Sequence, residues 1–152
     1  MIRWVFKKFI ELSPEELYAI LQLRNEVFVV EQNCVFQDAD DKDQSSVHLM
    51  GWREKKLVAY TRIVPPGQSY KEPSIGRVVT AQQERGKGTG HELMKFSISK
   101  IHELYSQADI KIGAQLYLKK FYESLGFLQS SEVYPEDGID HIEMTRITHK
   151  DA

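Results

Sequence analysis

The segment QQERGKGTG, residues 82–90, places three glycines at alternate positions between two segments of different periodicity. Before it, SIGRVVT at 74–80 has the β-branched composition of a strand. After it, HELMKFSISKIHELY at 91–105 repeats apolar residues at helical spacing. A glycine inside a helix costs about 1 kcal/mol relative to alanine. The three glycines therefore predict a loop that ends a strand and begins an amphipathic helix.

The rest of the chain alternates between strand and helix patterns. Ser13 as N-cap, Pro14 at the first helical position and Glu16 completing a capping box predict a helix over 13–30. The other expected elements are strands at 2–6, 47–52, 57–64 and 110–114, a polar loop at 31–46, a helix at 116–125 ending at Gly126, and a closing hairpin of 127–134 with 139–147 around a turn at 135–138. The pattern has no repeat or linker, and predicts one α/β domain over residues 1–152 with a mixed sheet.

Composition limits the classes of function. The chain has 152 residues, of which 41% are hydrophobic and 28% charged, as is usual for a globular domain. A net charge of −2 argues against a nucleic-acid partner. The only cysteine is Cys34, so neither a disulfide framework nor a cysteine-based zinc site is expected. Residues 1–12 lack the continuous apolar stretch and the cleavage site expected of a signal peptide, and no stretch approaches the length of an apolar membrane span. We expect a cytoplasmic monomer or homodimer that binds no metal, nucleic acid or membrane.

The glycine segment has the properties of an anion site. A glycine-rich loop before a helix presents unpaired N–H groups beside the positive end of the helix dipole, and Arg85 and Lys87 add positive charge. A P-loop and a dinucleotide fingerprint counted from Gly86 both need a glycine at position 91, which is His91, so both are excluded. We expect a pyrophosphate ligand. The alternative is a glycine-rich loop shaped only by packing.

A second motif, FYESLGF at 121–127, sets Tyr122 four residues before Gly126. Tyr122 is expected beside the core-facing stripe of its helix, which Leu118, Phe121 and Leu125 would form. A tyrosine in such a position usually packs with its hydroxyl satisfied. Taken alone, this motif favours a packing role.

Together these segments resemble the GNAT superfamily of acetyl-CoA-dependent N-acyltransferases, over essentially the whole chain. Gln83-x-x-Gly86-x-Gly88 matches the signature Q/R-x-x-G-x-G/A, and YESLGF matches the ending Y-x-x-x-G-F. More narrowly, the chain resembles the small ElaA-type branch at residues 23–40, 48–52, 75–79, 113–127 and 136–144. The resemblance implies a mixed, mostly antiparallel sheet of about seven strands, splayed between the fourth and fifth and flanked by about four helices.

The resemblance also implies acetyl-CoA as the acyl donor. The residues that would hold the pyrophosphate are Arg85, Gly86, Lys87, Gly88, Thr89 and Gly90. The backbone of Val78, Val79 and Thr80 would pair with the pantetheine arm, and the N–H of Val79 or a neighbour would polarise the thioester carbonyl. Tyr122 would protonate the departing thiolate. Gln115 and Leu118 depart from the Asn and Ala frequent in the family, although Gln115 can still offer an amide to the pantetheine.

The sequence does not single out the group that takes the proton of the attacking amine, whose ammonium form has a pKa near 10.4. Four residues on segments expected to face the acceptor are candidates: Glu31, His48, Arg77 and His141. Histidine changes charge near neutral pH and can relay a proton. Each candidate has a structural alternative: a hydrogen-bonded histidine, a solvated carboxylate at a helix end, or, for Arg77, a pair with an acid or with an acceptor carboxylate.

The acidic run DADDKD at 38–43 and the cysteine invite two further hypotheses. An EF-hand is excluded because Lys42, Asp43 and Leu49 stand where a ligand, a glycine and a glutamate are required. A solvated loop is expected, with attraction of a cationic amine as the alternative. Cys34 has no activating neighbour at an evident spacing and is expected to be a small buried hydrophobe, so direct attack by the amine is preferred to an acyl-enzyme.

The predicted function is transfer of an acetyl group from acetyl-CoA to a primary amine. The alternative is a non-catalytic acyl-CoA-binding or sensing module on the same fold. A scaffold that serves only for dimer contacts does not account for Gly86, Gly88 and Gly90. The sequence leaves the acceptor open among small amines, antibiotics, polyamines and protein amines.

Overall fold

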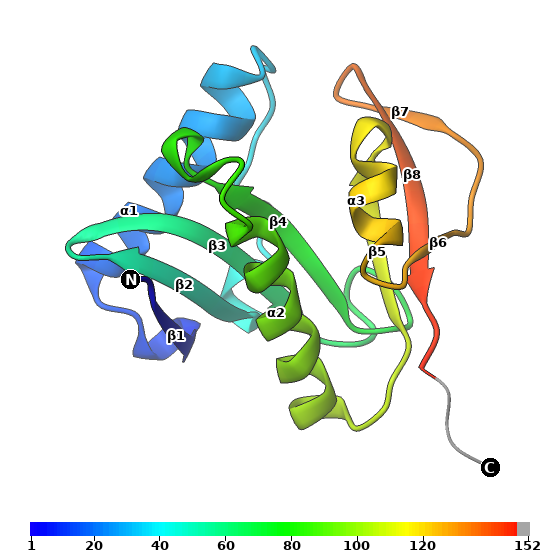
Figure 1. Ribbon diagram of the computed structural model, residues 1–152, viewed down its shortest axis with the longest axis horizontal. Helices are drawn as coiled ribbons and strands as arrows, with labels where there is room; N and C mark the ends of the chain where they lie inside the picture. The colour runs from blue at the N-terminus through cyan, green and yellow to red at the C-terminus, as the bar shows by residue number, and fades with distance from the viewer. Residues whose placement is uncertain (149–152) are drawn as a thin grey trace.

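Two antiparallel sheets that separate between β4 and β5 form the centre of the computed structural model, which describes residues 1–148 (Figure 1). The first sheet has the order β1-β2-β3-β4, with β1 (Arg3–Lys8), β2 (Val47–Arg53), β3 (Lys56–Val64) and β4 (Ser74–Thr80). The second has the order β5-β8-β6, with β7 also pairing with β8; its strands are β5 (Ile110–Gln115), β6 (Leu128–Gln129), β7 (Tyr134–Glu136) and β8 (Ile139–Arg146). The predicted α/β class and splayed, mostly antiparallel sheet are confirmed. The predicted domain includes residues 149–152, which lie outside the described residues, and its extent remains a prediction.

Strands β4 and β5 meet only where they begin. The N–H of Lys111 donates to the carbonyl of Pro73 at 3.2 Å, which ties the first residues of the two strands together. Beyond that point no ladder joins them within residues 1–148, and the strands diverge toward Thr80 and Gln115 (Figure 1). The divergence leaves a wedge with backbone on both sides.

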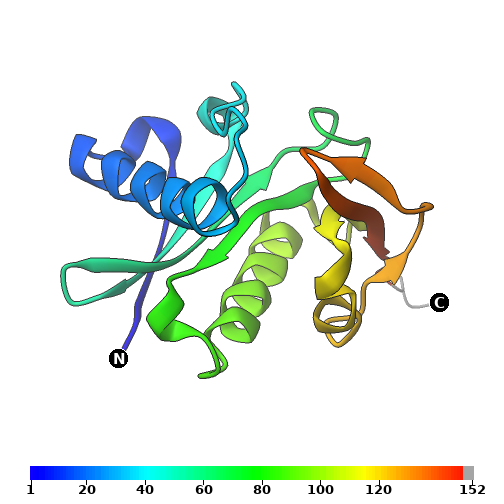
Figure 2. The same cartoon turned by 90° about the horizontal axis from the view of Figure 1, so that it is seen from above.

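Three α-helices and one π-helix lie against the sheets in the described part of the chain. They are α1 (Pro14–Arg24), the π-helix η2 (Asn25–Glu31), α2 (Thr89–Tyr105) and α3 (Lys119–Glu123). Short 3₁₀ helices are η1 (Phe9–Glu11), η3 (Asp43–Ser45), η4 (Gln82–Glu84) and η5 (Leu116–Leu118). Helices α1 and η2 lie over one face of the first sheet and α2 over the other (Figure 2).

The first helix begins as predicted and then changes type. Ser13 Oγ accepts from the N–H of Glu16 at 3.1 Å, and Glu16 Oε1 accepts from the N–H of Ser13 at 2.8 Å, which completes the capping box. From Asn25 the helix continues with π geometry, whose wider turn changes the direction of successive side chains. As a result, Phe28 and Glu31 face the wedge rather than solvent alone.

Helix α2 joins the two sheets through its predicted apolar face. Met94, Ile98 and Ile101 are buried in one cluster with side chains of both sheets, including Ile63 of β3 and Ile112 of β5. Burial of each such side chain contributes about 1.5–3 kcal/mol. Leu104, which follows Ile101 at the helical spacing of this face, is instead 41% exposed. Because the strands touch only at one end, this cluster carries most of the contact between the sheets.

The closing hairpin differs from the prediction of one strand over 127–134. The strand is interrupted between β6 and β7, and the turn is formed by Asp137 and Gly138. At the interruption, the hydroxyl of Ser131 accepts the N–H of Glu143 at 2.8 Å in place of a backbone carbonyl. A serine hydroxyl competes with ladder pairing in this way, which allows the chain to leave β8 and return.

A buried network of arginines and aspartates corrects the expectation of a solvated acidic loop. Asp43 is 8% exposed, and its Oδ1 accepts from Arg24 at 2.8 Å and from Arg62 at 2.9 Å. Asp40 binds Arg62, and Asp38 binds Arg24. A buried charge is tolerated only when it is paired, so the acidic residues 38–43 fold back onto the sheet.

We expect Asp43→Asn to lower the free energy of unfolding by about 3–5 kcal/mol, because it leaves two buried guanidinium groups without their shared anion. Urea denaturation monitored by circular dichroism measures this change. Asp41→Asn is the matched control, since Asp41 is exposed on the same loop and should change the value by less than about 0.5 kcal/mol. Equal effects of the two substitutions would contradict the role assigned to the network.

Stability should also fall in acid. Burial alone would raise the pKa values of Asp40 and Asp43, but hydrogen bonds from Arg62 and Arg24 respectively bring both below the ordinary value. Carboxylates with a lowered folded pKa contribute stability above their unfolded pKa, about 4, and lose it as the pH falls further. The free energy of unfolding should therefore decline below about pH 4. Denaturation across pH 3–7 tests this, and Asp40→Asn should make the decline shallower.

Candidate functional site

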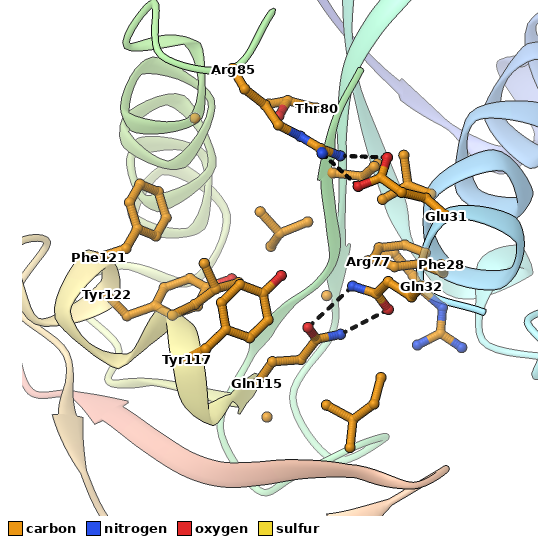
Figure 3. A pocket seen from close by; sticks show the side chains of 18 of the residues that line it. Phe28, Glu31, Gln32, Arg77, Thr80, Arg85, Gln115, Tyr117, Phe121 and Tyr122 are labelled. Carbon is orange, nitrogen blue, oxygen red and sulfur yellow. Dashed lines mark hydrogen bonds and ion pairs between the residues drawn. The ribbon is translucent and has the colours of Figure 1, made fainter. Parts of the chain in front are cut away.

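A cleft of about 600 Å³ occupies the wedge between β4 and β5. Its walls are the end of η2 with the loop that follows, β4 with the start of α2, and β5 with η5, α3 and the β7–β8 turn (Figure 3). The predicted residues that line it are Glu31, Arg77, Val78, Val79, Thr80, Arg85, Gly86, Gly88, Thr89, Gly90, Gln115, Tyr122 and His141. Lys87, which is exposed on the loop, and His48 do not line it. The structure thus gathers residues from five separated segments.

Glu84 fixes the position of the glycine loop. Its side chain is 2% exposed and accepts from Arg53 Nε and Nη2, both at 2.9 Å, and from Thr89 Oγ1 at 3.2 Å. The hydrogen bonds from Arg53 hold the pKa of Glu84 below its usual range. One carboxylate therefore ties the β2–β3 hairpin to the first residue of α2.

The start of α2 has the open backbone expected of an anion site. Gly86 and Gly88 both have φ of +81°, a conformation that favours glycine, and a Cβ on either would meet no atom within 4 Å. Gly88 is the N-cap and offers no side-chain cap to the helix. The first N–H groups of a helix have no partner within it. Here they lie beside the cleft, at the positive end of a 17-residue helix.

A β-bulge in β4 lies deeper in the wedge. Tyr60 pairs with Val79 and Arg62 with Gly76, so Arg77 and Val78 together oppose the single residue Thr61. Arg77 has φ of +49°. A bulge leaves one residue outside the ladder and turns nearby backbone groups away from the neighbouring strand. Val79, the predicted backbone donor, directly follows this bulge. Gly76, which directly precedes the bulge, was the signal in the sequence, since a single glycine inside a strand pattern is typical of a bulge.

Tyr122 combines a packed ring with a hydroxyl in the cleft. The residue is 5% exposed, and its ring makes edge contacts with Phe121 and Phe127 at centroid distances of 5.1 and 6.0 Å. Figure 3 shows the hydroxyl directed into the cleft. Burial, and to a lesser degree Tyr117, raises the pKa of Tyr122, so the phenol keeps its proton at neutral pH. Tyr122 therefore packs its ring in the core and presents its hydroxyl to the cleft.

Among the cleft residues that the sequence analysis did not name as candidates, two bear directly on the site. Tyr117 in η5 is 72% exposed, and its side chain extends into the cleft beside Tyr122 (Figure 3). Gln32 exchanges two amide hydrogen bonds with Gln115, each of 3.2 Å, so the predicted pantetheine contact is already paired with another side chain. The one signal available for Tyr117 was an aromatic residue outside the apolar stripe of the helix predicted over 116–125. Gln32 had none, because its partner is 83 residues away.

The two histidine candidates have different surroundings. His48 is fully buried, and its Nε2 donates to the carbonyl of Asp43 at 2.9 Å while its Nδ1 accepts from Tyr60 at 2.6 Å. Burial lowers the pKa of His48. His48 is thus neutral, fully bonded and remote from the cleft lining, which corrects its expected acceptor-facing position. It joins the network that holds the acidic loop.

His141 does lie at the cleft. It is 8% exposed on β8, directly opposite Gln115 in the β5–β8 ladder. Its Nδ1 donates to the carbonyl of Ile139 at 2.7 Å, and its Nε2 lies 3.5 Å from a carboxylate oxygen of Glu136. In the neutral ring, the hydrogen on Nδ1 leaves the Nε2 lone pair available to a proton donor.

Arg77 and Cys34 are held by structural contacts. Arg77 Nη2 donates to the carbonyl of Asp38 at 2.9 Å, and its Nε lies 2.8 Å from Asp38 Oδ1 without the N–H pointing at it, so that contact is an ion pair only. Its charge is therefore matched within the buried network. The Cys34 thiol is buried and donates to the carbonyl of Asp137 at 3.2 Å, in keeping with the expected buried position.

The aspartates of the acidic run do not form a free cation site, because Asp38, Asp40 and Asp43 are bound to arginines. The hypothesis that the run attracts an amine is not supported for these three. Over residues 1–148, no group of three or more His, Cys, Asp or Glu side chains could hold a metal ion. No helix in the same range is long and apolar enough to cross a membrane.

Comparison with known proteins agrees with this geometry. Residues 9–148 match the family model described as acetyltransferase (GNAT) domain. Protein ElaA of Escherichia coli strain K12 is 43% identical over 148 residues, which cover 96% of this chain and 97% of that protein. The crystal structure of an acyl-CoA N-acyltransferase from Pseudomonas aeruginosa superposes with a TM-score of 0.92 at 41% identity, covering 96% and 99% of the two chains. That of E. coli ElaA gives 0.91 at 42% identity, with the same coverage.

We expect Gly88→Val to weaken CoA binding by about tenfold or more, because a branched side chain would stand among the N–H groups at the start of α2. Isothermal titration calorimetry measures the dissociation constant. Gly67→Val is the control: Gly67 also has a positive φ, of +88°, and open space around its Cβ, but it lies in the turn after β3, outside the cleft lining. An equal loss in both variants would indicate a general backbone effect and not an anion site.

Proposed function

The chain belongs to the GNAT acetyltransferase family, and we propose that it transfers the acetyl group of acetyl-CoA to a primary amine by direct attack within a ternary complex. GNAT proteins use acyl-CoA donors; the choice of acetyl and of an amine is our inference. One observation carries it: the open start of α2 and the hydroxyl of Tyr122 face the same cleft. A donor whose phosphates lie at the first group can reach the second with its thioester.

The residues of the donor half fit CoA. The backbone N–H groups from Arg85 to Gly90 would bind the pyrophosphate, since they are open and lie at the positive end of α2. The backbone of Val78, Val79 and Thr80 borders the wedge, where an extended pantetheine arm would add to β4 like another strand. Gln115 would exchange its bond to Gln32 for one to the arm. When bound, CoA supplies the activated acyl group.

Two groups of the chain would act on the acyl group. The N–H of Val79, beside the bulge, would donate to the developing oxyanion, a contribution of about 3–4 kcal/mol when the donor is well placed. Tyr122 would give its proton to the departing sulfur. General-acid catalysis of this kind raises the reaction rate by about 10²–10⁴-fold. The raised pKa of Tyr122 ensures that the proton is present at neutral pH.

His141 is our choice for the group that takes the proton of the amine, directly or through water. It lines the cleft, and its bond to Ile139 leaves Nε2 as the acceptor. His48 is set aside because both of its ring nitrogens are bonded. Direct attack is favoured over an acyl-enzyme, because the thiol of Cys34 is donating to Asp137 and is not poised as a thiolate.

The compartment and partners follow from the same features. The single cysteine is unpaired and buried, which suits the reducing cytoplasm, and we assign the protein there. The two partners that the cleft requires are the acyl-CoA and the amine. Both a monomer and a homodimer are compatible with this proposal, and light scattering distinguishes them.

The test is release of free thiol from acetyl-CoA in the presence of putrescine, tyramine, a peptide with a free N-terminus, and an N-blocked peptide that contains lysine. Release above the no-acceptor control with at least one of these supports the proposal, and mass spectrometry of the product identifies an amide. If acetyl-CoA raises the melting temperature but no amine releases thiol, the non-catalytic binding module replaces the enzyme.

We expect Tyr122→Phe to lower kcat by one to three orders of magnitude while CoA affinity stays nearly unchanged, as loss of a general acid should. Steady-state kinetics and calorimetry measure the two quantities. Tyr105→Phe removes a hydroxyl from another partly buried tyrosine outside the cleft lining and serves as the control. Full activity of the Tyr122 variant would remove this residue from the mechanism.

A further inference from the structure

Residues at the end of η2 reach across the cleft and bind its opposite walls. Glu31 forms a bidentate ion pair with Arg85, with Nη1–Oε2 and Nη2–Oε1 distances of 2.5 and 3.0 Å. Its neighbour Gln32 binds Gln115, and the Cys34 thiol binds the carbonyl of Asp137. Figure 3 shows the first two pairs crossing from η2 to the facing elements. We call residues 31–34 the strap.

Polar contacts hold most of the strap in place, and Cys34 is its one buried residue. The flanking side chains of Val30 and Val35 are 67% and 97% exposed, so they add little to its anchoring. The side chains of Arg85 and Glu31 are themselves 42% and 37% exposed. An ion pair this accessible favours its closed form by a factor of up to about five. The strap is therefore closed in the empty protein but can be opened by a competing ligand.

Arg85 is the point at which such competition would occur. It directly precedes Gly86, so its guanidinium belongs to the rim of the proposed pyrophosphate site. A phosphate group forms the same bidentate contact with arginine as a carboxylate does, and it carries more negative charge. Glu31 thus occupies, with its carboxylate, the position at Arg85 that a phosphate of the donor would take.

We propose that Glu31 is an exchangeable carboxylate, bound to Arg85 in the empty cleft and released, when the CoA phosphates bind Arg85, to hold the ammonium group of the acceptor. The proposal rests on the function proposed above and adds a recognition residue to it. Charge balance supports the second part of this proposal, in which Glu31 binds the ammonium group. Once Arg85 has turned to the donor, Glu31 is an unmatched anion in the cleft lining, and such a group favours a cationic partner.

The location of Glu31 supports the same assignment. It lines the cleft at the C-terminal end of η2, next to Phe28 and across from the β5 wall. The arginine of the buried network that borders the cleft, Arg77, is matched by Asp38 and does not compete for it. Glu31 and Tyr122 lie on opposite sides of the cleft, so an ammonium group held by Glu31 would face Tyr122 across it (Figure 3).

The first experiment measures CoA affinity by isothermal titration calorimetry. Glu31→Gln should bind CoA about two- to fivefold more tightly than the unmodified protein, because the donor no longer displaces a charged partner of Arg85. Glu103→Gln is the matched control, since Glu103 is also ion-paired, with Lys100, but on the far part of α2. Affinity of Glu31→Gln equal to that of the unmodified protein, or weaker, would overturn the proposal.

A double-mutant cycle locates the effect at Arg85. Arg85→Gln should weaken CoA binding by about tenfold. In that background Glu31→Gln should cause no further change, because the pair it would break is already absent. The same gain in affinity in both backgrounds would mean that Glu31 acts on CoA by general repulsion and not through exchange of Arg85, and the proposal would fail.

The second half is tested with the amine of the panel that releases thiol fastest. Glu31→Gln should raise the KM for that amine by about tenfold or more, with a smaller change in kcat, since a charged hydrogen bond to the acceptor is lost. Glu31→Asp retains the carboxylate on a shorter side chain. It should raise this KM less than Glu31→Gln does, while tightening CoA binding similarly. Equal KM values for the two variants would overturn the assignment to the ammonium group.

The two proposals fail in different ways. Absence of CoA binding, or of thiol release with every amine, by the unmodified protein would refute the proposed function. Normal binding and turnover, combined with unchanged CoA affinity in Glu31→Gln, would refute only the exchange at Arg85. Circular dichroism and thermal melting of each variant confirm that the comparison is between folded proteins, as the partial exposure of both side chains leads us to expect.

Discussion

The site depends on the way β4 and β5 begin together and then part. One hydrogen bond, from Lys111 to Pro73, fixes the point of contact, and the apolar face of α2 keeps the sheets at a set distance beyond it. Two parallel strands that begin side by side, as β4 and β5 do, usually keep pairing along their length, so that neither facing edge is left open. Here the edges stay open, so backbone groups are available to an extended ligand, and the start of α2 and Tyr122 lie at the same opening.

The buried network of arginines and aspartates determines the remaining wall of the cleft. Arg24 and Arg62 hold Asp43, and Arg77 holds Asp38, so the acidic segment is folded against the first sheet. The strap begins where η2 ends and leads into this segment. A firm anchor on one side and exposed polar pairs on the other let the strap move without disturbing the core.

Sequence reasoning named most of the candidate residues that line the cleft, but it misplaced one of the candidates for the acceptor side. The glycine loop could be predicted as an anion site because its chemistry lies within a few residues. The motif around Tyr122 by itself favoured a packing role, and only the family resemblance placed Tyr122 in the site. His48 was misplaced, because alternation along a strand does not tell which of two faces meets a cleft. The pairs of Glu31 with Arg85 and Gln32 with Gln115 join residues 54 and 83 positions apart, for which no local pattern exists.

The sequence by itself determined the order of elements, the capping of the first helix and the loop at the start of α2, because these depend on local backbone preferences and on periodicity. The family resemblance rested on matched motifs in the right order. Only the tertiary structure decided which carboxylates are available to bind a ligand. Asp38, Asp40 and Asp43 of the acidic run are paired with buried arginines, while Glu31 is paired with an exposed one. Composition counts charges, but the folded chain sets their partners and burial, and these decide whether a charge stabilises the fold or remains available to a ligand.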